Sequence, residues 1–185
     1  MSRSAAFLDR DGVLNEIVLR DELVSSPRSL DEYVPAATAQ HDVARLRQAG
    51  VIVVVVTNQP DIERQLIEPA TVEQITAHLL EVVGVDAVMT CPHTASTGCD
   101  CRKPKPGLLI QAALAYDIDL ARSWTVGDRW VDIAAGHAAG TATVLIDRDY
   151  SWSQADEGAP RPDHHAADLD AAVDLILEIE RGRAR

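Results

Sequence analysis

Two acidic residues directly follow the first apolar stretch of the sequence. Residues 4–9 read SAAFLD, and Asp9 and Asp11 stand on either side of Arg10. Two neighbouring carboxylates repel each other, so a pair at this spacing needs nearby positive charge. A carboxylate is also a poor nucleophile toward phosphate until a cation such as Mg²⁺ neutralises the repulsion between the two anions. The pair therefore raises the question of what other charged groups lie near it.

Polar groups also follow three later apolar runs. TNQ (57–59) follows VIVVVV, Cys91 follows residues 85–90, and GDRWVD (127–132) ends a fourth run. In an open α/β sheet, ligands bind outside the carboxyl ends of the parallel strands. Each of these groups alone is as readily a turn or a helix cap. Four such ends together predict one active site at that edge of the sheet.

Phosphoryl transfer through an aspartyl-phosphate is the chemistry that fits these groups. Asp9 is expected to attack the phosphorus, and Asp128 to complete a Mg²⁺ site from another strand end. Asp11 would protonate the leaving group and then activate the water that hydrolyses the phosphoenzyme. Thr57 and a lysine would hold the transferring oxygens, over which negative charge spreads.

The motifs DRDGVLN, TNQ, RKPKPG and GDRWVD, in this order, resemble those of the haloacid dehalogenase (HAD) superfamily of phosphatases. Within it, the chain is similar to the branch that contains D-glycero-D-manno-heptose 1,7-bisphosphate 7-phosphatases and the histidinol-phosphatase domain. The resemblance covers about residues 4–147. It implies that Asp9 is the nucleophile and Asp11 the acid and base. It also implies that both bind Mg²⁺ together with Asp128, Asp11 through its main-chain carbonyl.

The same resemblance suggests roles for the other polar residues of the motifs. Thr57 and Lys103 would hold the phosphate. Asp132, four residues after Asp128, is expected to support the metal-bound waters or the lysine. The positions that match substrate contacts in this branch are Asn58, Gln59, Arg102 and Arg129.

A cysteine-rich segment, CPHTASTGCDC (91–101), contains all three cysteines of the chain. Cys91, His93, Cys99 and Cys101 give the Cys₃His composition of a closed structural zinc site. The alternatives are a disulfide and reduced surface thiols. A reducing compartment and the short Cys99–Cys101 spacing disfavour the disulfide. The HAD branch named above has such a zinc loop. Zinc bound by Cys101 would fix where the next two residues, Arg102 and Lys103, enter the phosphate site.

Short apolar strands alternate with helical patterns, which predicts a Rossmann-like, doubly wound α/β fold with a mainly parallel sheet. Pro35 with Gly50, and Pro69 with Gly84, bracket the first two helices. The spacing leaves no room for a large cap domain, so residues 1–185 are expected to form a single HAD-like phosphatase domain. The predicted strands are 4–9, 51–56, 85–90, 123–127 and 142–147; later helices are predicted at 109–116, 130–139 and 169–179, and a polar loop at 151–165.

The overall composition limits the classes of molecule that the protein is expected to bind. A net charge of −12 and a pI near 4.8 argue against nucleic-acid and anionic-membrane binding. The longest comparable apolar run, 51–56, is far shorter than the ~20 residues of a membrane span. The run before Asp9 is too short for a secretory signal. We therefore expect a cytoplasmic monomer that acts on a small phosphorylated metabolite.

The resemblance implies a Mg²⁺-dependent phosphomonoester hydrolase that removes the 7-phosphate of D-glycero-D-manno-heptose 1,7-bisphosphate. Arg102 suits a second anionic group, as in a sugar bisphosphate, because guanidinium binds phosphate bidentately. The alternatives are a histidinol-phosphate or other small-metabolite phosphatase and, from another class, a non-catalytic phosphate-binding scaffold. The chain departs from the branch after TNQ, where PDIERQ (60–65) replaces the usual small residues and glycine. This departure lies beside the predicted site and bears on the choice of substrate.

Overall fold

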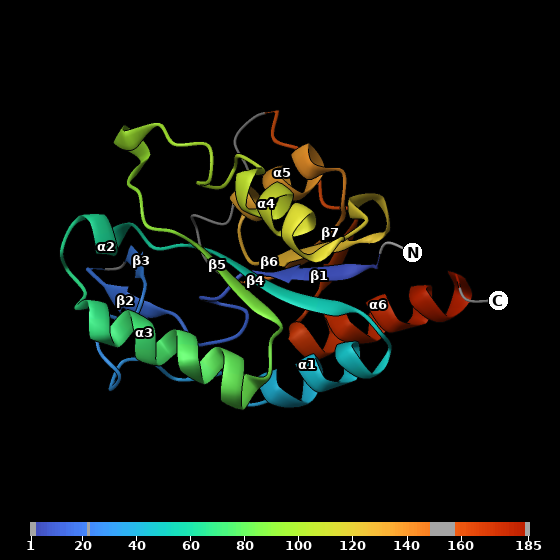
Figure 1. Ribbon diagram of the computed structural model, residues 1–185, viewed down its shortest axis with the longest axis horizontal. Helices are drawn as coiled ribbons and strands as arrows, with labels where there is room; N and C mark the ends of the chain where they lie inside the picture. Colours follow the sequence, from blue (N-terminus) through green and yellow to red (C-terminus); the bar gives the residue numbers. More distant parts are fainter. Residues whose placement is uncertain (1–2, 22, 149–157, 184–185) are drawn as a thin grey trace.

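The computed structural model describes residues 3–21, 23–148 and 158–183, and Figure 1 shows a sheet with helices on both faces. The strands are β1 (Ala5–Leu8), β2 (Val18–Arg20), β3 (Leu23–Ser25), β4 (Ile52–Asn58), β5 (Ala87–Cys91), β6 (Trp124–Gly127), β7 (Ala142–Ile146) and β8 (His164–Ala166). The helices are α1 (Ala39–Gln48), α2 (Pro60–Glu63), α3 (Pro69–His78), α4 (Gly107–Tyr116), α5 (Trp130–Ala139) and α6 (Leu169–Arg183). Short helical turns are η1 (Leu79–Val83), η2 (Ala95–Thr97) and η3 (Leu120–Arg122).

Six strands form one parallel sheet in the order β5-β4-β1-β6-β7-β8. β1 lies inside it, with Phe7 paired to Val54 of β4 on one side and to Thr125 of β6 on the other. The chain builds outward from β1 through β4 to β5, and then returns to β6 to build the other half. Such a reversal of strand order is where ligands bind in doubly wound sheets. The predicted α/β fold and its five predicted strands are confirmed.

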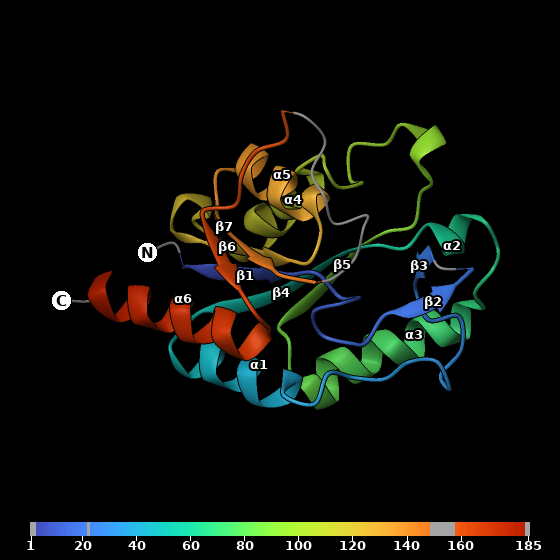
Figure 2. The ribbon, with the colours of Figure 1, turned by 180° about the vertical axis from the view of Figure 1, so that it is seen from behind.

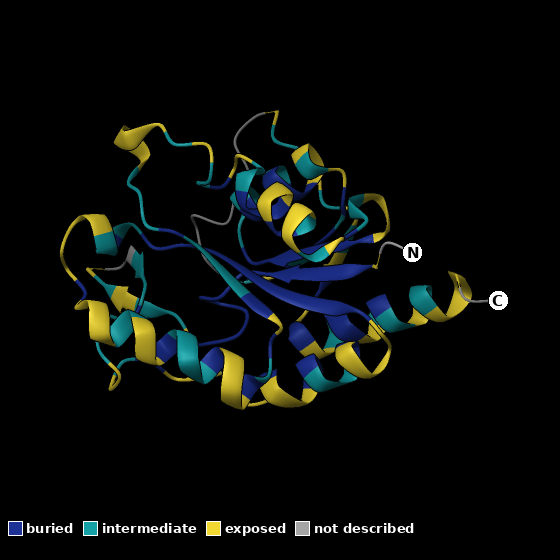
Figure 3. Cartoon of the chain, in the orientation of Figure 1, coloured by how far each residue is buried: buried dark blue, intermediate teal, exposed yellow. Residues whose placement is uncertain are grey.

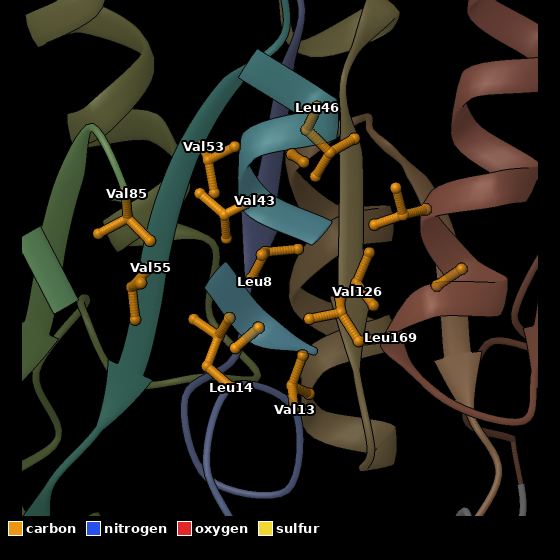
Figure 4. Close-up of a cluster of buried hydrophobic side chains, with 14 of the residues drawn as sticks. Leu8, Val13, Leu14, Val43, Leu46, Val53, Val55, Val85, Val126 and Leu169 are labelled. Atoms are coloured by element: carbon orange, nitrogen blue, oxygen red, sulfur yellow. The ribbon is translucent and has the colours of Figure 1, made fainter. Parts of the chain in front are cut away.

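Alternate residues of the central strands pack into two separate cores. Leu8, Val53 and Val55 belong to the core shared with α1, α3 and α6 (Figure 4). Phe7 and Val54 belong to the core shared with α4 and α5. Helices therefore cover both faces, and the central strands β1, β4 and β6 are buried throughout (Figure 3). This explains why the β4 sequence is apolar without alternation.

The first helix begins later than predicted. Pro35 does not open α1, which starts at Ala39 with Thr38 as its N-cap. Residues 35 and 36 instead pair with the loop after β1, where the Ala36 N–H donates to the Leu14 carbonyl at 2.9 Å. A backbone bonded to that loop cannot also enter the helix. The second helix begins at Pro69 as predicted, and η1 extends it to Gly84, whose φ of 85° terminates it.

Three short strands, β2, β3 and β8, were not predicted from the sequence. No strand was predicted in the connection between β1 and α1, but it contains the antiparallel hairpin of β2 and β3. The predicted polar loop 151–165 is wrong at its end, because His164 and His165 belong to β8, which pairs with β7. Residues 151–157 of that loop lie outside the described part of the chain. Both misses involve three-residue strands, which are too short to show a period in the sequence.

The described residues contain no large cap domain over the sheet. The β2–β3 hairpin and α2 lie near the carboxyl ends of the strands, on the same side of the molecule as the start of the cysteine-rich segment, as both views show (Figures 1 and 2). The two termini lie at the opposite end. None of the helices within the described ranges combines the length and the apolar character needed to cross a membrane.

Candidate active site

The carboxyl ends of four neighbouring strands supply the polar groups that the sequence predicts. Asp9 follows β1, Thr57 and Asn58 end β4, Cys91 ends β5, and Asp128 follows β6. Asp9, Thr57 and Asp128 are each about 1% exposed. Charged groups are buried to this extent only when other groups compensate their charge. The carboxylates of Asp9 and Asp128 must therefore have compensating partners nearby.

The two oxygens of Asp9 differ in their surroundings. Oδ1 accepts a hydrogen bond from the Arg10 N–H at 2.7 Å and lies 3.0 Å from Lys103 Nζ. Oδ2 accepts no hydrogen bond from the described residues, although Arg129 Nη2 lies 3.6 Å away. Burial raises the pKa of Asp9, but the charges of Lys103 and Arg129 outweigh burial and hold it below its usual value. Asp9 is therefore ionised, with one oxygen fixed and the other available to a ligand.

Lys103 is fully enclosed in the site. Its Nζ lies 3.0 Å from Asp9 Oδ1 and 2.5 Å from Asp132 Oδ1, and it donates to the Val56 carbonyl at 2.7 Å. The contacts with Asp9 and Asp132 are ion pairs, and the contact with the Val56 carbonyl is a hydrogen bond. Burial lowers the pKa of Lys103, but Asp132 and Asp9 outweigh burial and raise it. The lysine therefore brings a permanent positive charge beside the predicted nucleophile, and Asp132 contacts the lysine directly.

Asp9, Asp128 and Asp132 present carboxylate oxygens that lie within 4.8 Å of one another and could hold a metal ion. Neither oxygen of Asp128 accepts a hydrogen bond from the described residues. The three carboxylates face two cations, Lys103 and Arg129, so one negative charge is left unbalanced. Burial, followed by the charges of Asp9 and Asp132, raises the pKa of Asp128 to about 8. The unpartnered oxygens and the excess negative charge fit a divalent cation with oxygen ligands.

Gly12 allows the first strand end to approach the second. A Cβ atom at this position would lie 2.1 Å from Asp128 Oδ2, and the φ of Gly12 is +83°. Any other residue would therefore both clash with the predicted metal ligand and strain the backbone. The glycine of the DRDG motif is needed for this contact.

Asp11 is not part of the cluster of Asp9, Asp128 and Asp132, and several hydrogen-bond donors surround its carboxylate. Its Oδ2 accepts hydrogen bonds from Ser26 Oγ and Gln59 Nε2, each at 2.8 Å, and its Oδ1 accepts one from Asn15 Nδ2 at 2.9 Å. Arg10 donates to both oxygens at 3.0–3.1 Å. Sequence reasoning gave no role to Arg10 or Ser26. Ser26 follows the missed hairpin, so no local signal could have placed it near Asp11.

Two residues that are predicted to contact substrate, Asn58 and Gln59, also contact protein groups in the site. Gln59 Nε2 bridges Asp11 and Thr57, donating to Thr57 Oγ1 at 2.8 Å. Asn58 uses both ends of its amide on the Lys103 backbone: Nδ2 donates to its carbonyl at 3.0 Å, and Oδ1 accepts from its N–H at 3.1 Å. These bonds fix the strand end to the segment that carries the lysine.

Replacing Asn58 by alanine is expected to act through Lys103. Two buried hydrogen bonds are lost and the Lys103 backbone groups are left unpaired, which costs roughly 1–3 kcal/mol each. We expect kcat to fall about tenfold or more while KM changes little, together with a lower Tm. The matched control is Gln111→Ala on the exposed face of α4. A rise in KM at unchanged kcat would instead show that Asn58 binds substrate.

Arg102 and Arg129 both border the site. Arg102 donates through Nη1 to the His93 carbonyl at 3.1 Å, which links it to the cysteine-rich segment. Arg129 lies 3.6 Å from Asp9 and 3.9 Å from Asp128. Both arginines line a pocket of about 100 Å³ together with Asp11 and Asp128. Ligand pockets are usually about 300–1,000 Å³, so this one can enclose a small group such as phosphate but not a whole sugar.

The four predicted zinc ligands converge. Cys91 Sγ lies 3.2 Å from Cys101 Sγ and 3.7 Å from Cys99 Sγ, and His93 Nδ1 lies 3.3 Å from Cys101 Sγ. All three cysteines are free thiols. A tetrahedral zinc with Zn–S bonds of about 2.3 Å separates its sulfur ligands by about 3.8 Å. The arrangement is close to that geometry, and Cys91 and Cys101 are joined by residues 92–100 into one compact unit.

Two charged side chains support this cysteine-rich segment, and neither was predicted. Lys105 Nζ donates to the carbonyls of Gly98 and Cys99, at 3.2 and 2.8 Å. Glu63, at the end of α2, accepts hydrogen bonds from the N–H of Thr94 and from Thr97 Oγ1. Glu63 belongs to the PDIERQ segment, so one part of that departure contacts the predicted zinc loop.

Comparisons with known proteins identify the family to which the chain belongs. The family model described as HAD-hydrolase-like matches residues 100–172. A D-glycero-β-D-manno-heptose-1,7-bisphosphate 7-phosphatase from Pseudomonas aeruginosa is 42% identical over 151 residues, covering 79% of this chain and 82% of the relative. The protein of the same name from Bordetella bronchiseptica is 36% identical, over 92% and 96% of the two chains.

A solved structure matches over nearly the whole chain. It is D,D-heptose 1,7-bisphosphate phosphatase from B. bronchiseptica, complexed with magnesium and phosphate. Its TM-score is 0.81 at 35% identity, and the match covers 95% of this chain and 99% of that one. The chain therefore belongs to the HAD-like hydrolases, in the family of the heptose-bisphosphate phosphatases, and it is a phosphatase.

Proposed function

We propose that the protein is a single-domain, Mg²⁺-dependent phosphomonoester hydrolase that removes the 7-phosphate of D-glycero-D-manno-heptose 1,7-bisphosphate. The observation that carries the proposal is the buried group of Asp9, Lys103 and Asp128, in which one oxygen of Asp9 and both of Asp128 lack hydrogen bonds. Its relatives with that name support the choice of sugar.

The first half of the reaction uses the free oxygen of Asp9. Oδ2 attacks the phosphorus, and the bond from phosphorus to the sugar oxygen breaks. Asp11, on the pocket wall, gives a proton to that oxygen, so the sugar leaves as an alcohol. Lys103 and Thr57 hold the oxygens of the transferring group, where charge develops.

The second half restores the enzyme. Asp11, now a carboxylate, takes a proton from water, and the hydroxide attacks the phosphorus of the Asp9 phosphoryl group. The bond between phosphorus and Oδ2 breaks, inorganic phosphate leaves, and Asp9 is again ionised beside Lys103. The hydrogen bonds from Gln59, Ser26 and Asn15 hold Asp11 in place between the two steps.

Asp9, Asp128 and the Asp11 carbonyl are the groups proposed to hold Mg²⁺. When bound, the ion lowers the repulsion between the carboxylates and the phosphate and polarises the phosphoryl oxygens. Asp132 points to Lys103 and to the Arg129 N–H, so it orients the lysine and the first turn of α5. The residues present therefore fit the ion in both charge and ligand type.

Binding of Mg²⁺ is expected to release a proton below pH 8. The pKa of Asp128 is raised to about 8 in the metal-free protein, so Asp128 holds a proton below that pH and must lose it to bind the ion. Mg²⁺ affinity should therefore increase with pH up to about 8 and level off above it. Calorimetric titration in buffers of different ionisation enthalpy measures the proton released. A Mg²⁺ affinity that does not change between about pH 6 and pH 8 would contradict this expectation.

A substrate panel tests the proposed function. With excess Mg²⁺, kcat/KM is compared for both anomers of the heptose bisphosphate, for histidinol phosphate and for a generic phosphomonoester. We expect the heptose bisphosphate to be preferred. Preference for histidinol phosphate would support the second candidate, and no hydrolysis of any compound would support a non-catalytic phosphate-binding role.

The remaining parts of the proposal concern the setting of the enzyme. Zinc held by Cys91, His93, Cys99 and Cys101 would be structural, because four protein ligands leave no open position. We propose a cytoplasmic monomer that takes part in carbohydrate metabolism as a step in heptose biosynthesis. The net charge of −12 supports a small metabolite rather than nucleic acid or an anionic membrane as its partner.

A further inference from the structure

An ion cluster that includes part of the PDIERQ segment borders the active-site pocket. Asp61 Oδ2 lies 2.8 Å from Arg28 Nε, and Asp61 Oδ1 lies 3.2 Å from Arg64 Nη1. Asp61 is 5% exposed, whereas the side chains of Arg28 and Arg64 are 33% and 53% exposed. The carboxylate is therefore the buried centre of the cluster, and the two guanidinium groups lie at its solvent side.

The cluster has an excess of positive charge. One carboxylate between two guanidinium groups leaves one positive charge unbalanced. Each arginine uses one nitrogen on Asp61 in the contacts above, and a guanidinium has five N–H donors. Arg64 therefore keeps donors for a ligand after Asp61 has fixed its position.

Asp61 and Arg64 line the same pocket as Arg102, Arg129 and Asp128. The pocket can enclose one phosphate but not a whole sugar, so the rest of a substrate must lie at its mouth. Arg102 comes from the cysteine-rich side of that mouth and Arg64 from the α2 side. Two guanidinium groups from different elements suit a second phosphate, which each can bind bidentately.

We propose that Arg64, held by Asp61 and Arg28, is a specificity-determining residue that binds the distal phosphate of a bisphosphorylated substrate together with Arg102. This rests on the proposed function in taking the reaction to be phosphomonoester hydrolysis. Asp61 and Arg28 act as positioning residues: Asp61 sets where the guanidinium of Arg64 lies, and Arg28 holds the other oxygen of Asp61. The same bonds attach the chain after the β2–β3 hairpin to α2.

The test compares two substrates that differ only in the distal phosphate: a heptose 1,7-bisphosphate and the corresponding heptose 7-phosphate. For Arg64→Gln, we expect KM for the bisphosphate to rise about 10- to 100-fold, the range expected for a charge-assisted hydrogen bond. Its kcat and both constants for the monophosphate should stay close to those of the parent. Asp61→Asn should give a smaller change in the same direction.

The matched control is Arg47→Gln, because Arg47 is similarly exposed and pairs with a single aspartate, Asp86, in another part of the protein. Equal losses of Arg64→Gln on both substrates, or no change on either, would overturn the inference and leave the phosphatase function intact. A parent enzyme that does not distinguish the two substrates would also overturn it. If the parent hydrolyses neither, the proposed function fails. In that case, calorimetry measures the affinity of the parent and of Arg64→Gln for both sugars. A loss of affinity in Arg64→Gln for the bisphosphate alone supports the inference, and any other result overturns it.

Discussion

Replacing Asp9 by asparagine is expected to remove phosphatase activity, with kcat falling by roughly 10⁴-fold or more, because the reaction loses its nucleophile. The amide keeps the shape of the carboxylate, so the change is chemical rather than steric. It also removes one negative charge beside Lys103, whose remaining ion-pair partner is Asp132 at 2.5 Å. The fold should persist, since the two cores on either side of β1 do not involve this side chain.

Two kinds of measurement test this prediction: one shows whether the variant is folded, and the other detects the covalent intermediate in the parent. Circular dichroism and Tm should show a folded Asp9→Asn protein, and mass spectrometry of acid-quenched parent enzyme should find a phosphoryl group on the peptide that contains Asp9. Asp31→Asn, an exposed position, is the matched control and should retain full activity. Undiminished hydrolysis by Asp9→Asn would rule out the aspartyl-phosphate mechanism.

Loss of zinc is expected to lower activity by about 10- to 100-fold or more even in excess Mg²⁺, the range seen when groups that orient a metal site are removed. Cys101 directly precedes Arg102 and Lys103, and Arg102 is bonded to the carbonyl of the zinc ligand His93. Without the ion, no metal–ligand bonds hold the three cysteines and His93 together, and the segment 92–101 loses its closed geometry. Both cations that enter the phosphate site are then less well placed.

The effect of zinc loss on activity can be measured with Cys101→Ser or after treatment of the parent with a zinc-selective chelator. Bound zinc is determined by atomic emission, and activity is assayed with Mg²⁺ restored. Ser96→Ala, at the exposed tip of the same segment, should keep both zinc and activity. Full activity in a protein shown to be free of zinc would show that the segment does not position Arg102 and Lys103.

Much of the site follows from where polar groups stand relative to apolar runs. VIVVVV could be recognised as a buried central strand, and its end therefore located Thr57 and Asn58 at the carboxyl edge of the sheet. The same reasoning located Asp9 and Asp128. The Cys₃His spacing is local in sequence, so the convergence of Cys91, His93, Cys99 and Cys101 needed no knowledge of the fold.

Other contacts could not be predicted, because they join segments that are distant in sequence and whose local patterns are weak. Ser26 reaches Asp11 only because a hairpin of two three-residue strands turns the chain back toward the first strand. Asn58 was expected to contact substrate because it matches a substrate-binding position of the HAD branch. The structure uses its amide on the backbone of Lys103, 45 residues away. A single sequence shows which side chains can hydrogen-bond but not which partner a loop brings to them.

The unbalanced carboxylate at Asp128 has a consequence for the lifetime of the folded protein. A pKa raised from 3.8 to about 8 means that the folded state binds this proton more tightly than the unfolded state. The resulting stabilisation is complete below the ordinary pKa and is lost as the pH rises through about 8. In mildly alkaline solution the metal-free fold therefore carries an electrostatic penalty at the centre of its sheet. A bound cation offsets that penalty and adds about 2.7 kcal/mol at a concentration of 100 times Kd. The supply of Mg²⁺ would then govern resistance to unfolding and proteolysis as well as turnover.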